Sequence, residues 1–580
     1  MQWQYLTADA TIQAALCKEA GLDPLTARLL ALRGIKTGAE AANYLSPSLE
    51  QLHSPYLMRG MKEAVERICA AITNGELILI YGDYDVDGTT AVVILKTAIE
   101  LCGGICDFHV PHRIREGYGM QDDVIERAAA GGVKLVISVD TGIRAFQAAE
   151  TAKRVGVDLI VTDHHLPEAV MGVPAALAVL NPNQSGCEYP CKALCGAGVA
   201  FKVAQALLAK FKDQAEQARL IPSFLKMVAL ATIADVVPLV GENRVMAKLG
   251  LEGLRRPVNG GLKALMDVSG LLDRGRALTA GDVGFRLGPR INAAGRMDIA
   301  RDVIELFTSR EPARCREIAE KLNQLNMDRQ TEEANIVAAI DEQLQAQPEL
   351  AQRSLLVFAG EGWHRGVVGI VASRVVEKTG RPALVVATDG DQAHGSGRSI
   401  PRLHLLDALE SCRELFTRYG GHAHAVGFSL PSARLPQLKE RVDAYARGHL
   451  SDKDFLPELA IDAKIELSEV TPRLMETLQR LGPFGQGNPE PVFSSSAVSL
   501  VSPPKIIKEK HIKLKVNQTV DARSSYNYEA VGWRMAERLT TEALAPGERL
   551  DLAFTVTMNF HPDFGGLELS LEDFRKTNRS

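Results

Sequence analysis

Short apolar runs alternate with helix-like stretches between residues 76 and 182, and this alternation limits the fold more than any other feature. The runs are ELILIYG, KLVISVDTG, DLIVTDHH and ALAVLNPN, and stretches such as TTAVVILKTAIELCG and DDVIERAAAGG separate them. This pattern is typical of parallel strands connected by helices. We therefore expect an α/β fold built on a parallel sheet.

Aspartates stand at the ends of three of these runs. They are Asp83, Asp140 and Asp163. Sites in open α/β sheets lie beyond the carboxyl ends of the strands, so these acids can meet without being close in sequence. Any one of them could instead cap a helix or stabilise a turn. Three acids at corresponding positions predict a shared site.

The segment YGDYDVDGTTA places Asp83, Asp85 and Asp87 at alternate positions. In an extended chain, two or three of these side chains share one face. Neighbouring carboxylates repel one another, and burying them is costly unless a cation compensates their charge. The alternative is a solvated acidic turn, which fits poorly between an apolar strand and an apolar helix. We therefore expect a metal site.

Two more segments add candidate ligands. His164 and His165 follow Asp163 in VTDHH, and imidazoles beside carboxylates suit Mn²⁺ more readily than Mg²⁺. Asp235 lies among apolar residues in MVALATIADVVPL, on what we expect to be a buried helix. A carboxylate there needs an arginine partner or a metal ion, and the sequence leaves both possibilities open.

With 580 residues, the chain is expected to form three or more domains. One long helix, with Pro312 in its first turn, is predicted for the segment EPARCREIAEKLNQLNMDRQTEEANIVAAIDEQLQ. This helix could connect two domains or belong to a single core. SLLVFAG and PALVVAT begin a second α/β pattern. Five late β-rich runs, AVSLVS, HIKLKV, YEAVGWR, LDLAFTVTM and LELSLEDF, predict a small oligonucleotide-binding (OB) barrel. The expected division is a helical segment at 1–50, a catalytic α/β domain at 51–300, the connecting helix at 301–348, the second α/β domain at 349–453 and the barrel at 454–580.

Composition excludes some classes of protein. Hydrophobic residues make up 46% and charged residues 24%, which are ordinary globular values. The longest apolar runs are too short to span a membrane, and MQWQYLTADATIQ lacks a signal pattern. We therefore expect a cytoplasmic protein that is not associated with a membrane. Cys187, Cys191 and Cys195 form the one cysteine cluster, but Pro190 interrupts a shared helix, so free thiols are expected rather than a metal site.

The motifs GDYDVDG, SVDTG, TDHH and TIADVVPL resemble, in order and spacing, those of the DHH phosphoesterase superfamily. The resemblance continues through GPRINAAGRM, SGRS and GGHAHAVGF, the last similar to the accessory DHHA1 domain. It covers nearly the whole chain and is strongest to the single-stranded-DNA-specific 5′→3′ exonucleases of the superfamily. It implies stepwise release of nucleotides in DNA recombination and repair, including mismatch repair.

The resemblance also implies a ligand set. Two divalent ions, Mn²⁺ or Mg²⁺, would be held by Asp85, Asp87, Asp140, His164 and Asp235, with the catalytic residues Asp83 and His165 close by. The ions would stabilise the attacking and leaving oxygens of phosphodiester hydrolysis. The sequence lacks a G-x-x-x-x-G-K-[ST] loop, which argues against an ATP-driven enzyme. Apart from the two divalent ions, we expect no cofactor.

Several polar residues are expected to contact nucleic acid, although each could be an ordinary surface group. By resemblance, Arg113, Ser396 and Arg398 would hold the terminal 5′ phosphate. Charge alone suggests Arg115 beside Arg113, and GPRINAAGRM adds Arg290, Asn292 and Arg296. His422 in GGHAHAVG is expected to contact a phosphate or a base.

A lysine-rich run in the expected barrel, KIIKEKHIKLK, includes Lys513 and Lys515 and has Glu509 as its one acid. Such a stripe suits tracking of a phosphate backbone, and Tyr526, Tyr528 and Trp533 could stack on bases. A solvated strand face is the alternative. The expected substrate is single-stranded DNA, with a single-strand-binding protein and a RecQ-type helicase as partners and a monomer as the oligomeric state.

Two other functions remain open at this point. A smaller phosphoesterase of the superfamily would cleave short oligonucleotides, cyclic dinucleotides or pyrophosphate, but the β-rich residues after about 455 speak against it. A non-catalytic scaffold would bind single strands without cutting them. The complete set of acids and histidines speaks against the scaffold.

Overall fold

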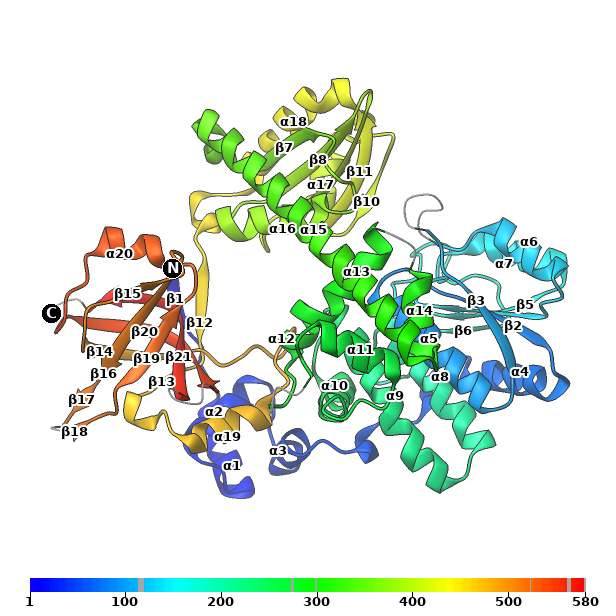
Figure 1. Ribbon diagram of the computed structural model, residues 1–580, viewed down its shortest axis with the longest axis horizontal. Coiled ribbons are helices and arrows are strands. Elements are labelled where there is room, and N and C mark those ends of the chain that lie inside the picture. Colours follow the sequence, from blue (N-terminus) through cyan, green and yellow to red (C-terminus); the bar gives the residue numbers. More distant parts are fainter. Residues whose placement is uncertain (113–118, 273–275, 298–299, 522, 561–564, 578–580) are drawn as a thin grey trace.

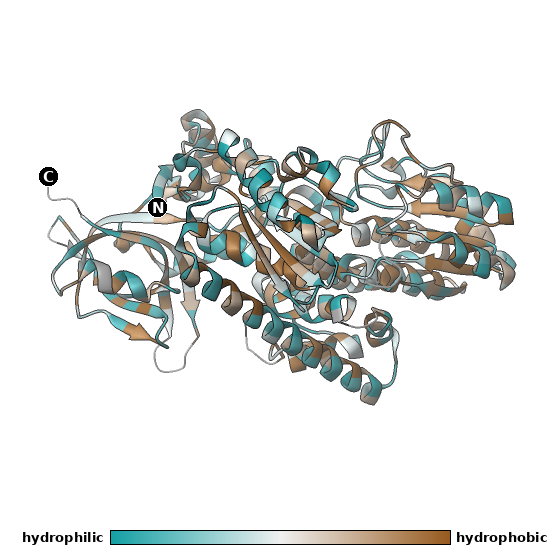
Figure 2. Ribbon diagram, turned by 90° about the horizontal axis from the view of Figure 1, so that it is seen from above, coloured by the Kyte–Doolittle hydropathy of each residue, from teal (hydrophilic) through white to brown (hydrophobic). Residues whose placement is uncertain are grey.

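A computed structural model describes residues 1–112, 119–272, 276–297, 300–521, 523–560 and 565–577 of the chain. Figure 1 shows two α/β units connected by a long helix, and a β-barrel beside the N-terminal helices. The expected fold class is confirmed. Figure 2 shows that the strands of the sheets are mainly hydrophobic, whereas the helices around them carry many hydrophilic residues.

The first α/β unit contains a wholly parallel sheet in the order β3-β2-β4-β5-β6. Its strands are β2 (Leu77–Tyr81), β3 (Ile105–His109), β4 (Leu135–Val139), β5 (Asp158–Thr162) and β6 (Ala178–Leu180). All four expected runs form strands. The sequence pattern missed β3 because this edge strand is only partly buried and carries polar residues.

Helices cover both faces of this sheet and continue beyond it. The helices that precede, connect or directly follow the strands along the chain are α4 (Met61–Asn74), α5 (Val86–Leu101), α6 (Asp122–Ala130), α7 (Phe146–Val155) and α8 (Gly196–Phe211). Those that follow are α9 (Gln214–Ala234), α10 (Gly241–Gly253), α11 (Gly260–Val268), α12 (Ala280–Asp282), a π-helical turn at Val283–Leu287, α13 (Gly288–Met297) and α14 (Arg301–Thr308).

The predicted long helix is present as α15 (Pro312–Ala346), with Pro312 at its first position. Its buried residues come from two different cores. Ile318 and Leu322 pack into the first α/β unit, whereas Ile336 and Ile340 pack into the second. The helix therefore connects the two units, as Figure 1 shows, and is not confined to one core.

The second α/β unit has a mixed sheet in the order β10-β11-β9-β8-β7, in which only β7 and β8 pair in parallel. Its elements are β7 (Leu356–Glu361), α16 (Val368–Thr379), β8 (Ala383–Asp389), β9 (Gln392–Arg398), α17 (Leu405–Glu410), β10 (Arg418–Gly421), β11 (Ala425–Pro431) and α18 (Leu435–His449).

The barrel closes because β14 pairs with both β20 and β16, which completes the ring β14-β20-β21-β19-β16. These five strands are the five predicted runs. The elements of this region are β12 (Glu458–Ile461), β13 (Ala463–Lys464), α19 (Pro472–Leu481), β14 (Phe493–Leu500), β15 (Lys505–Ile507), β16 (His511–Asn517), β17 (Thr519–Val520), β18 (Arg523–Ser524), β19 (Tyr528–Gly532), α20 (Ala536–Glu542), β20 (Arg549–Asn559) and β21 (Gly566–Lys576).

The N-terminal segment shares a hydrophobic core with the barrel, and Leu16, Leu29 and Leu30 pack in the same cluster as Phe493 and Phe554. It comprises β1 (Gln2–Tyr5), α1 (Ala10–Ala20), α2 (Pro24–Leu32) and α3 (Gly38–Leu45). The expectation of helices alone was wrong for β1, which forms a parallel pair with β12. We refer to these residues and the barrel together as the barrel module.

Short 3₁₀ turns complete the chain, at Leu49–Gln51, Pro55–Leu57, Pro348–Gln352, Arg413–Leu415, Ser432–Arg434, Asp452–Phe455 and Leu467–Glu469. Within the described ranges, none of the helices combines the length and the apolar character that crossing a membrane requires. All nine cysteines are free thiols, as expected for Cys187, Cys191 and Cys195.

Candidate metal centre

The strand order explains how acids from distant parts of the sequence come together. β2, β4 and β5 are neighbours in the sheet and run in the same direction. Asp83 follows the end of β2 by two residues, and Asp140 and Asp163 directly follow β4 and β5. Their carboxylates therefore meet at one edge of the sheet, and all three are buried.

Asp87 lies on the first turn of α5, and the start of α8 holds its carboxylate. The Gly196 N–H donates to Oδ2 at 2.6 Å, and the Ala197 N–H donates to Oδ1 at 2.7 Å. The amino end of a helix favours a negative charge, so α8 orients this carboxylate and stabilises it. Gly196 and Ala197 were not among the predicted site residues, although the small residues at the start of an apolar helix in CGAGVAF were a usable signal.

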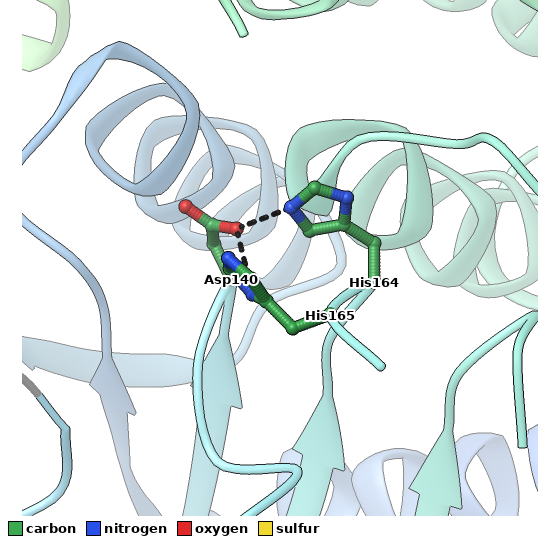
Figure 3. A group of neighbouring side chains, drawn as sticks. All are labelled: Asp140, His164 and His165. Atoms are coloured by element: carbon green, nitrogen blue, oxygen red, sulfur yellow. Dashed lines mark ion pairs between the residues drawn. The ribbon is translucent and has the colours of Figure 1, made fainter. Parts of the chain in front are cut away.

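Asp140 has a buried carboxylate oxygen that lacks a hydrogen-bond partner within the described residues. This Oδ1 lies 3.2 Å from His164 Nε2 and 4.0 Å from His165 Nδ1, as Figure 3 shows. Burial raises the pKa of Asp140 well above its usual value, and Asp87, Asp85 and Asp83 raise it further. An electron-rich atom in such surroundings calls for a positive charge.

Three overlapping groups of side chains can each surround a cation, because their ligand atoms lie within 4.8 Å of one another. The groups are Asp83, Asp85 and Asp140; Asp87, His164 and Asp235; and Asp140, His164 and His165. Carboxylates mixed with one or two imidazoles form a donor set that fits Mn²⁺ well and Mg²⁺ acceptably. The structure thus brings together all seven predicted catalytic residues.

Asp163 forms hydrogen bonds with both histidines. Its Oδ1 accepts hydrogen bonds from the His164 N–H and the His165 N–H, and lies 2.8 Å from His165 Nδ1. Burial alone would raise the pKa of Asp163, but His165, the Ile143 N–H and the charge of His164 together outweigh it, and the pKa is lowered. Burial would lower the pKa of His165, yet the bond to Asp163 raises it to about 9. Asp163 therefore fixes the orientation of the histidine pair.

The expected buried helix is present as the second half of α9, but Asp235 caps its carboxyl end, one residue beyond the helix, and is itself only partly buried. Its Oδ2 lies 3.8 Å from His164 Nε2. Among the described residues, the ion-pair partner of Asp235 is therefore this histidine of the cluster and not an arginine. Burial raises the pKa of Asp235 to about 8, with added repulsion from Asp87 and Asp85.

Helix α13 packs against the acidic loop that carries Asp83 to Asp87. Asn292 Oδ1 accepts a hydrogen bond from the Val86 N–H at 3.2 Å, and a Cβ on Gly295 would lie 2.6 Å from the Tyr84 carbonyl oxygen. Asn292, which we expected to contact nucleic acid, braces the acidic loop here. Asp85 in turn caps α5 by accepting from the Gly88 N–H, a role that the sequence did not suggest for this acid.

The two other expected contacts in α13 have partners within the protein. Arg296 Nη1 donates to the Gly366 carbonyl at 2.8 Å, which links α13 to the loop before α16 in the second unit. Arg290 donates to Asn323 Oδ1 on α15 at 3.0 Å, and burial lowers its pKa. Arg113 and Arg115 lie outside the described residues.

Ser396 and Arg398 lie together on β9 beside the amino end of α16. Arg398 Nη1 donates to Ser396 Oγ at 3.2 Å. A Cβ on Gly369, the second residue of α16, would lie 3.1 Å from Ser396 Oγ and 3.5 Å from Arg398 Nη2. A hydroxyl, a guanidinium and a helix amino end in one place form an arrangement that suits a phosphate. The exposed His422 lies on the β10–β11 turn, and β11 pairs with β9.

The barrel carries lysines on the outer face of β16, where Lys513 and Lys515 alternate with the buried Ile512, Leu514 and Val516. Lys513 forms an ion pair with Glu529 on β19, so Glu509 is not the only acid near the stripe. The expected stacking role of Tyr528 was wrong, because its ring is buried and its hydroxyl donates to the Val470 carbonyl. Tyr526 and Trp533 are 84% and 60% exposed and remain available for stacking.

The raised pKa of Asp235 predicts how pH affects stability. Its pKa is about 8 in the fold against 3.8 ordinarily, so the folded protein binds this proton more tightly than the unfolded chain does. Raising the pH from 6 to 8 should therefore lower the free energy of unfolding of the metal-free protein. His165, with a pKa of about 9 against 6.5 ordinarily, acts in the same direction because the folded protein also binds this proton more tightly than the unfolded chain does.

A cation competes with these protons, so stabilisation by Mn²⁺ should grow with pH. Melting temperatures measured with EDTA and with Mn²⁺ at pH 6, 7 and 8 test this. At 100 times the dissociation constant, a ligand stabilises the fold by about 2.7 kcal/mol. An equal Mn²⁺ shift at pH 6 and pH 8 would contradict the prediction.

Comparison with known proteins agrees with this architecture. Residues 77–232 match the DHH family, N-terminal domain, residues 352–448 match the DHHA1 domain, and residues 461–573 match the RecJ OB domain. The single-stranded-DNA-specific exonuclease RecJ of Bacillus subtilis is 36% identical over 562 residues, which cover 96% of this chain and 69% of that protein.

Two crystal structures of RecJ from Thermus thermophilus have similar folds, one in complex with Mn²⁺ and one with Mg²⁺. The Mn²⁺ complex matches with a TM-score of 0.82 at 28% identity, covering all of this chain and 80% of that one. The Mg²⁺ complex matches with a TM-score of 0.76 at 26% identity, covering all of this chain and 79% of that one.

A parallel sheet that gathers carboxylates and histidines at one edge, followed by a DHHA1 unit, defines a metal-dependent phosphoesterase of the DHH class. The OB barrel and the similarity over nearly the full length narrow the class further. The chain belongs to the RecJ family of single-stranded-DNA-specific exonucleases.

Proposed function

We propose that this protein removes nucleotides one after another from the 5′ end of single-stranded DNA by hydrolysing phosphodiester bonds with the help of two divalent cations. The observation that carries the proposal is the buried Asp140 carboxylate oxygen, which lies 3.2 Å from His164 Nε2 among further acids and lacks a hydrogen-bond partner within the described residues. Membership of the RecJ family supports the choice of single-stranded DNA as the substrate.

In this proposal, Asp85, Asp87, Asp140, His164 and Asp235 hold the cations, with Asp83 and His165 close by. The bound Mn²⁺ or Mg²⁺ would supply charge stabilisation for the attacking and leaving oxygens of the phosphodiester. The protein contributes the orientation of these ligands. The α8 amides hold Asp87, Asp163 holds the histidines, and Asn292 braces the acidic loop.

The proposed polarity rests on Ser396, Arg398 and the amino end of α16, which together would hold a terminal 5′ phosphate. Helix α13 connects this place to the acidic loop, since it contacts Val86 through Asn292 and Gly366 through Arg296. If water attacks phosphorus and the P–O3′ bond breaks, the released nucleotide keeps a 3′ hydroxyl. The shortened strand then carries a new 5′ phosphate for the next cycle.

The barrel would guide the strand, with Lys513 and Lys515 near its backbone and Tyr526 and Trp533 against its bases. Arg290, Arg296, His422 and, outside the described residues, Arg113 complete the set of proposed contacts. The barrel disfavours a phosphoesterase for short substrates, and the complete ligand set disfavours a scaffold. We further propose that the protein works as a cytoplasmic monomer in recombination and in repair, including mismatch repair. A single-strand-binding protein and a RecQ-type helicase would assist it.

A digestion experiment tests the proposed polarity. Oligonucleotides labelled at the 3′ end, with either a 5′ phosphate or a 5′ hydroxyl, are digested with Mn²⁺ and the products are followed over time. The phosphorylated strand should shorten stepwise from the 5′ end. Arg398→Ala should raise KM for this strand about tenfold or more, because a charge-assisted phosphate contact is lost, and should reduce the preference for a 5′ phosphate.

Arg447→Ala is the matched control, since Arg447 is an exposed arginine of the same unit that pairs with Asp443 on its own helix. It should behave like the wild type. Loss of nucleotides from the 3′ end, or an unchanged phosphate preference in Arg398→Ala, would refute the assigned polarity or the phosphate site respectively.

A further inference from the structure

Three consecutive polar residues open α10, and all three are buried. Glu242, Asn243 and Arg244 are 2%, 0% and 2% exposed. They follow Asp235 by seven to nine residues, and in the part of the chain that the structure describes their hydrogen bonds go to groups outside the metal cluster. Burial of polar groups at this density is costly unless each forms specific contacts. The contacts of these three residues lead in three different directions.

Asn243 connects two backbone segments that lead to two ligands of the same group, Asp87 and Asp235. Its Nδ2 donates to the Ala193 carbonyl at 2.5 Å and to the Pro238 carbonyl at 3.1 Å. Ala193 lies three residues before Gly196, whose N–H holds Asp87. Pro238 lies three residues after Asp235. One side-chain amide thus ties the segment that orients Asp87 to the segment that carries Asp235.

Glu242 anchors this turn to the body of the first α/β unit. Its Oε1 accepts from Lys202 Nζ at 2.6 Å and from the His53 N–H at 2.9 Å, and its Oε2 accepts from the Tyr189 hydroxyl at 2.6 Å. Lys202 belongs to α8, the helix whose amino end holds Asp87. The start of α10 is therefore rigidly attached to α8.

Arg244 reaches in the opposite direction, to the barrel module. Its Nη2 donates to the carbonyls of Arg480, Leu481 and Gly482, at 2.9, 3.2 and 2.8 Å, at the carboxyl end of α19. A helix carboxyl end favours a cation. The guanidinium also stacks on the Tyr44 ring of α3 at 3.7 Å. Arg244 thereby joins both parts of the barrel module to α10.

The segment after Asp235 touches the barrel module directly as well. The Leu239 N–H donates to the Gln486 carbonyl at 2.7 Å, in the stretch that connects α19 to β14. Between Asp235 and Leu239, Val236 adopts a left-handed conformation with φ of 58°, which is unfavourable for a β-branched residue. Such a conformation persists only where surrounding contacts enforce it.

We propose that Asn243 and Arg244 are positioning residues through which the seating of the barrel module sets the geometry of the metal centre, above all the place of Asp235. This inference rests on the proposed function, since it assigns the cluster to cations. Neither residue would touch the cations or the DNA. Loosening either contact should let the Asp235 turn relax and weaken cation binding, while the path of the strand along the barrel stays intact.

The experiment measures Mn²⁺ binding to the full-length protein without DNA, by titration with detection of free Mn²⁺ by electron paramagnetic resonance. Asn243→Ala and Arg244→Ala should each weaken Mn²⁺ binding about tenfold, the lower end of the range for residues that support metal ligands. Turnover should fall at low Mn²⁺ and recover at saturating Mn²⁺, with KM for the single strand unchanged.

Two control variants remove similar contacts elsewhere. Asn259→Ala removes an amide that donates to the Phe307 carbonyl and caps α11 in the same unit. Arg538→Ala removes an arginine of α20 that binds Glu542, Asp573 and the Phe574 carbonyl, all within the barrel module. Both should bind Mn²⁺ within about twofold of the wild type. Arg244→Lys and Asn243→Ser serve if the alanine variants do not fold, and should show the same change at smaller size.

Mn²⁺ affinities of the Asn243 and Arg244 variants that equal those of the controls would overturn the inference. Its failure is distinguishable from failure of the proposed function. If the wild type binds Mn²⁺ but does not shorten single strands, the function is wrong, whereas the effect of the variants on Mn²⁺ affinity still decides the inference.

Discussion

Asp140→Asn should lower kcat on single-stranded DNA on the order of 1000-fold, the scale of removing one preorganised group that stabilises charge. Asparagine has the size of aspartate and tolerates the left-handed conformation of residue 140, where φ is 58°, so the fold should persist. The substitution removes the charge from the buried Oδ1 that faces His164 and His165.

The same variant should melt at a higher temperature than the wild type in EDTA at pH 8, because a neutral amide avoids both the burial of a charge and the repulsion by neighbouring aspartates, which together raise the pKa of Asp140. It should also lose much of the stabilisation by Mn²⁺ and keep its affinity for a single-stranded oligonucleotide. Steady-state kinetics, melting curves and a binding titration test the three parts.

Asp158→Asn is the matched control, since Asp158 lies at the amino end of β5, away from the cluster, and pairs with Arg67. It should retain wild-type turnover. Near-normal turnover in Asp140→Asn would refute the metal centre, and equal losses in both variants would show that the effect is not specific to the cluster.

Gly196→Ala should reduce kcat by about 100-fold or more, since displacement of a reacting group by about 1 Å costs this much. The new Cβ would lie 2.5 Å from Asp140 Cβ and 2.6 Å from Asp140 Oδ1. Either Asp140 or the start of α8 must move. Movement of α8 would also withdraw the N–H groups that hold Asp87.

Gly448→Ala provides the comparison, because Gly448 is also helical and a Cβ there meets nothing within 4 Å. That variant should be as active as the wild type and slightly more stable, as alanine favours a helix more than glycine does. Mn²⁺ titrations should show weaker binding for Gly196→Ala alone. A fully active Gly196→Ala would mean that the cluster tolerates displacement and that its observed geometry is not required.

Much of the metal centre could be predicted from the sequence. The alternation of apolar runs and helical stretches identified β2, β4 and β5, and their acids lie at neighbouring carboxyl ends. The reason is that a parallel sheet presents all its strand ends at one edge, although the sequence did not show that these three strands are neighbours in the sheet. His164 and His165 directly follow Asp163 in the chain, so their place beside the acids could be predicted from the sequence alone.

The residues that orient these ligands were less visible. Gly196 and Ala197 act through backbone N–H groups, which no side-chain pattern reveals. Asn292 looked like a group that binds nucleic acid, but it accepts a bond from Val86, 206 residues earlier. Tyr528 looked available for stacking, but the curvature of the closed barrel buries its ring.

The sequence by itself determined many of the local elements: β2, β4, β5 and β6 of the first sheet, β7 and β8 of the second, the length of α15 and the five runs that close the barrel. These follow from the periodicity of apolar side chains, which each segment carries within itself. Only the tertiary structure decided which distant segments join. The pairing of β1 with β12, the shared core of the N-terminal helices and the barrel, and the contacts of Arg244 with α19 link residues hundreds of positions apart. Such contacts form between the surfaces of two folded parts and depend on how well the shapes and charges of these surfaces fit each other. The sequence of either segment alone does not show this fit.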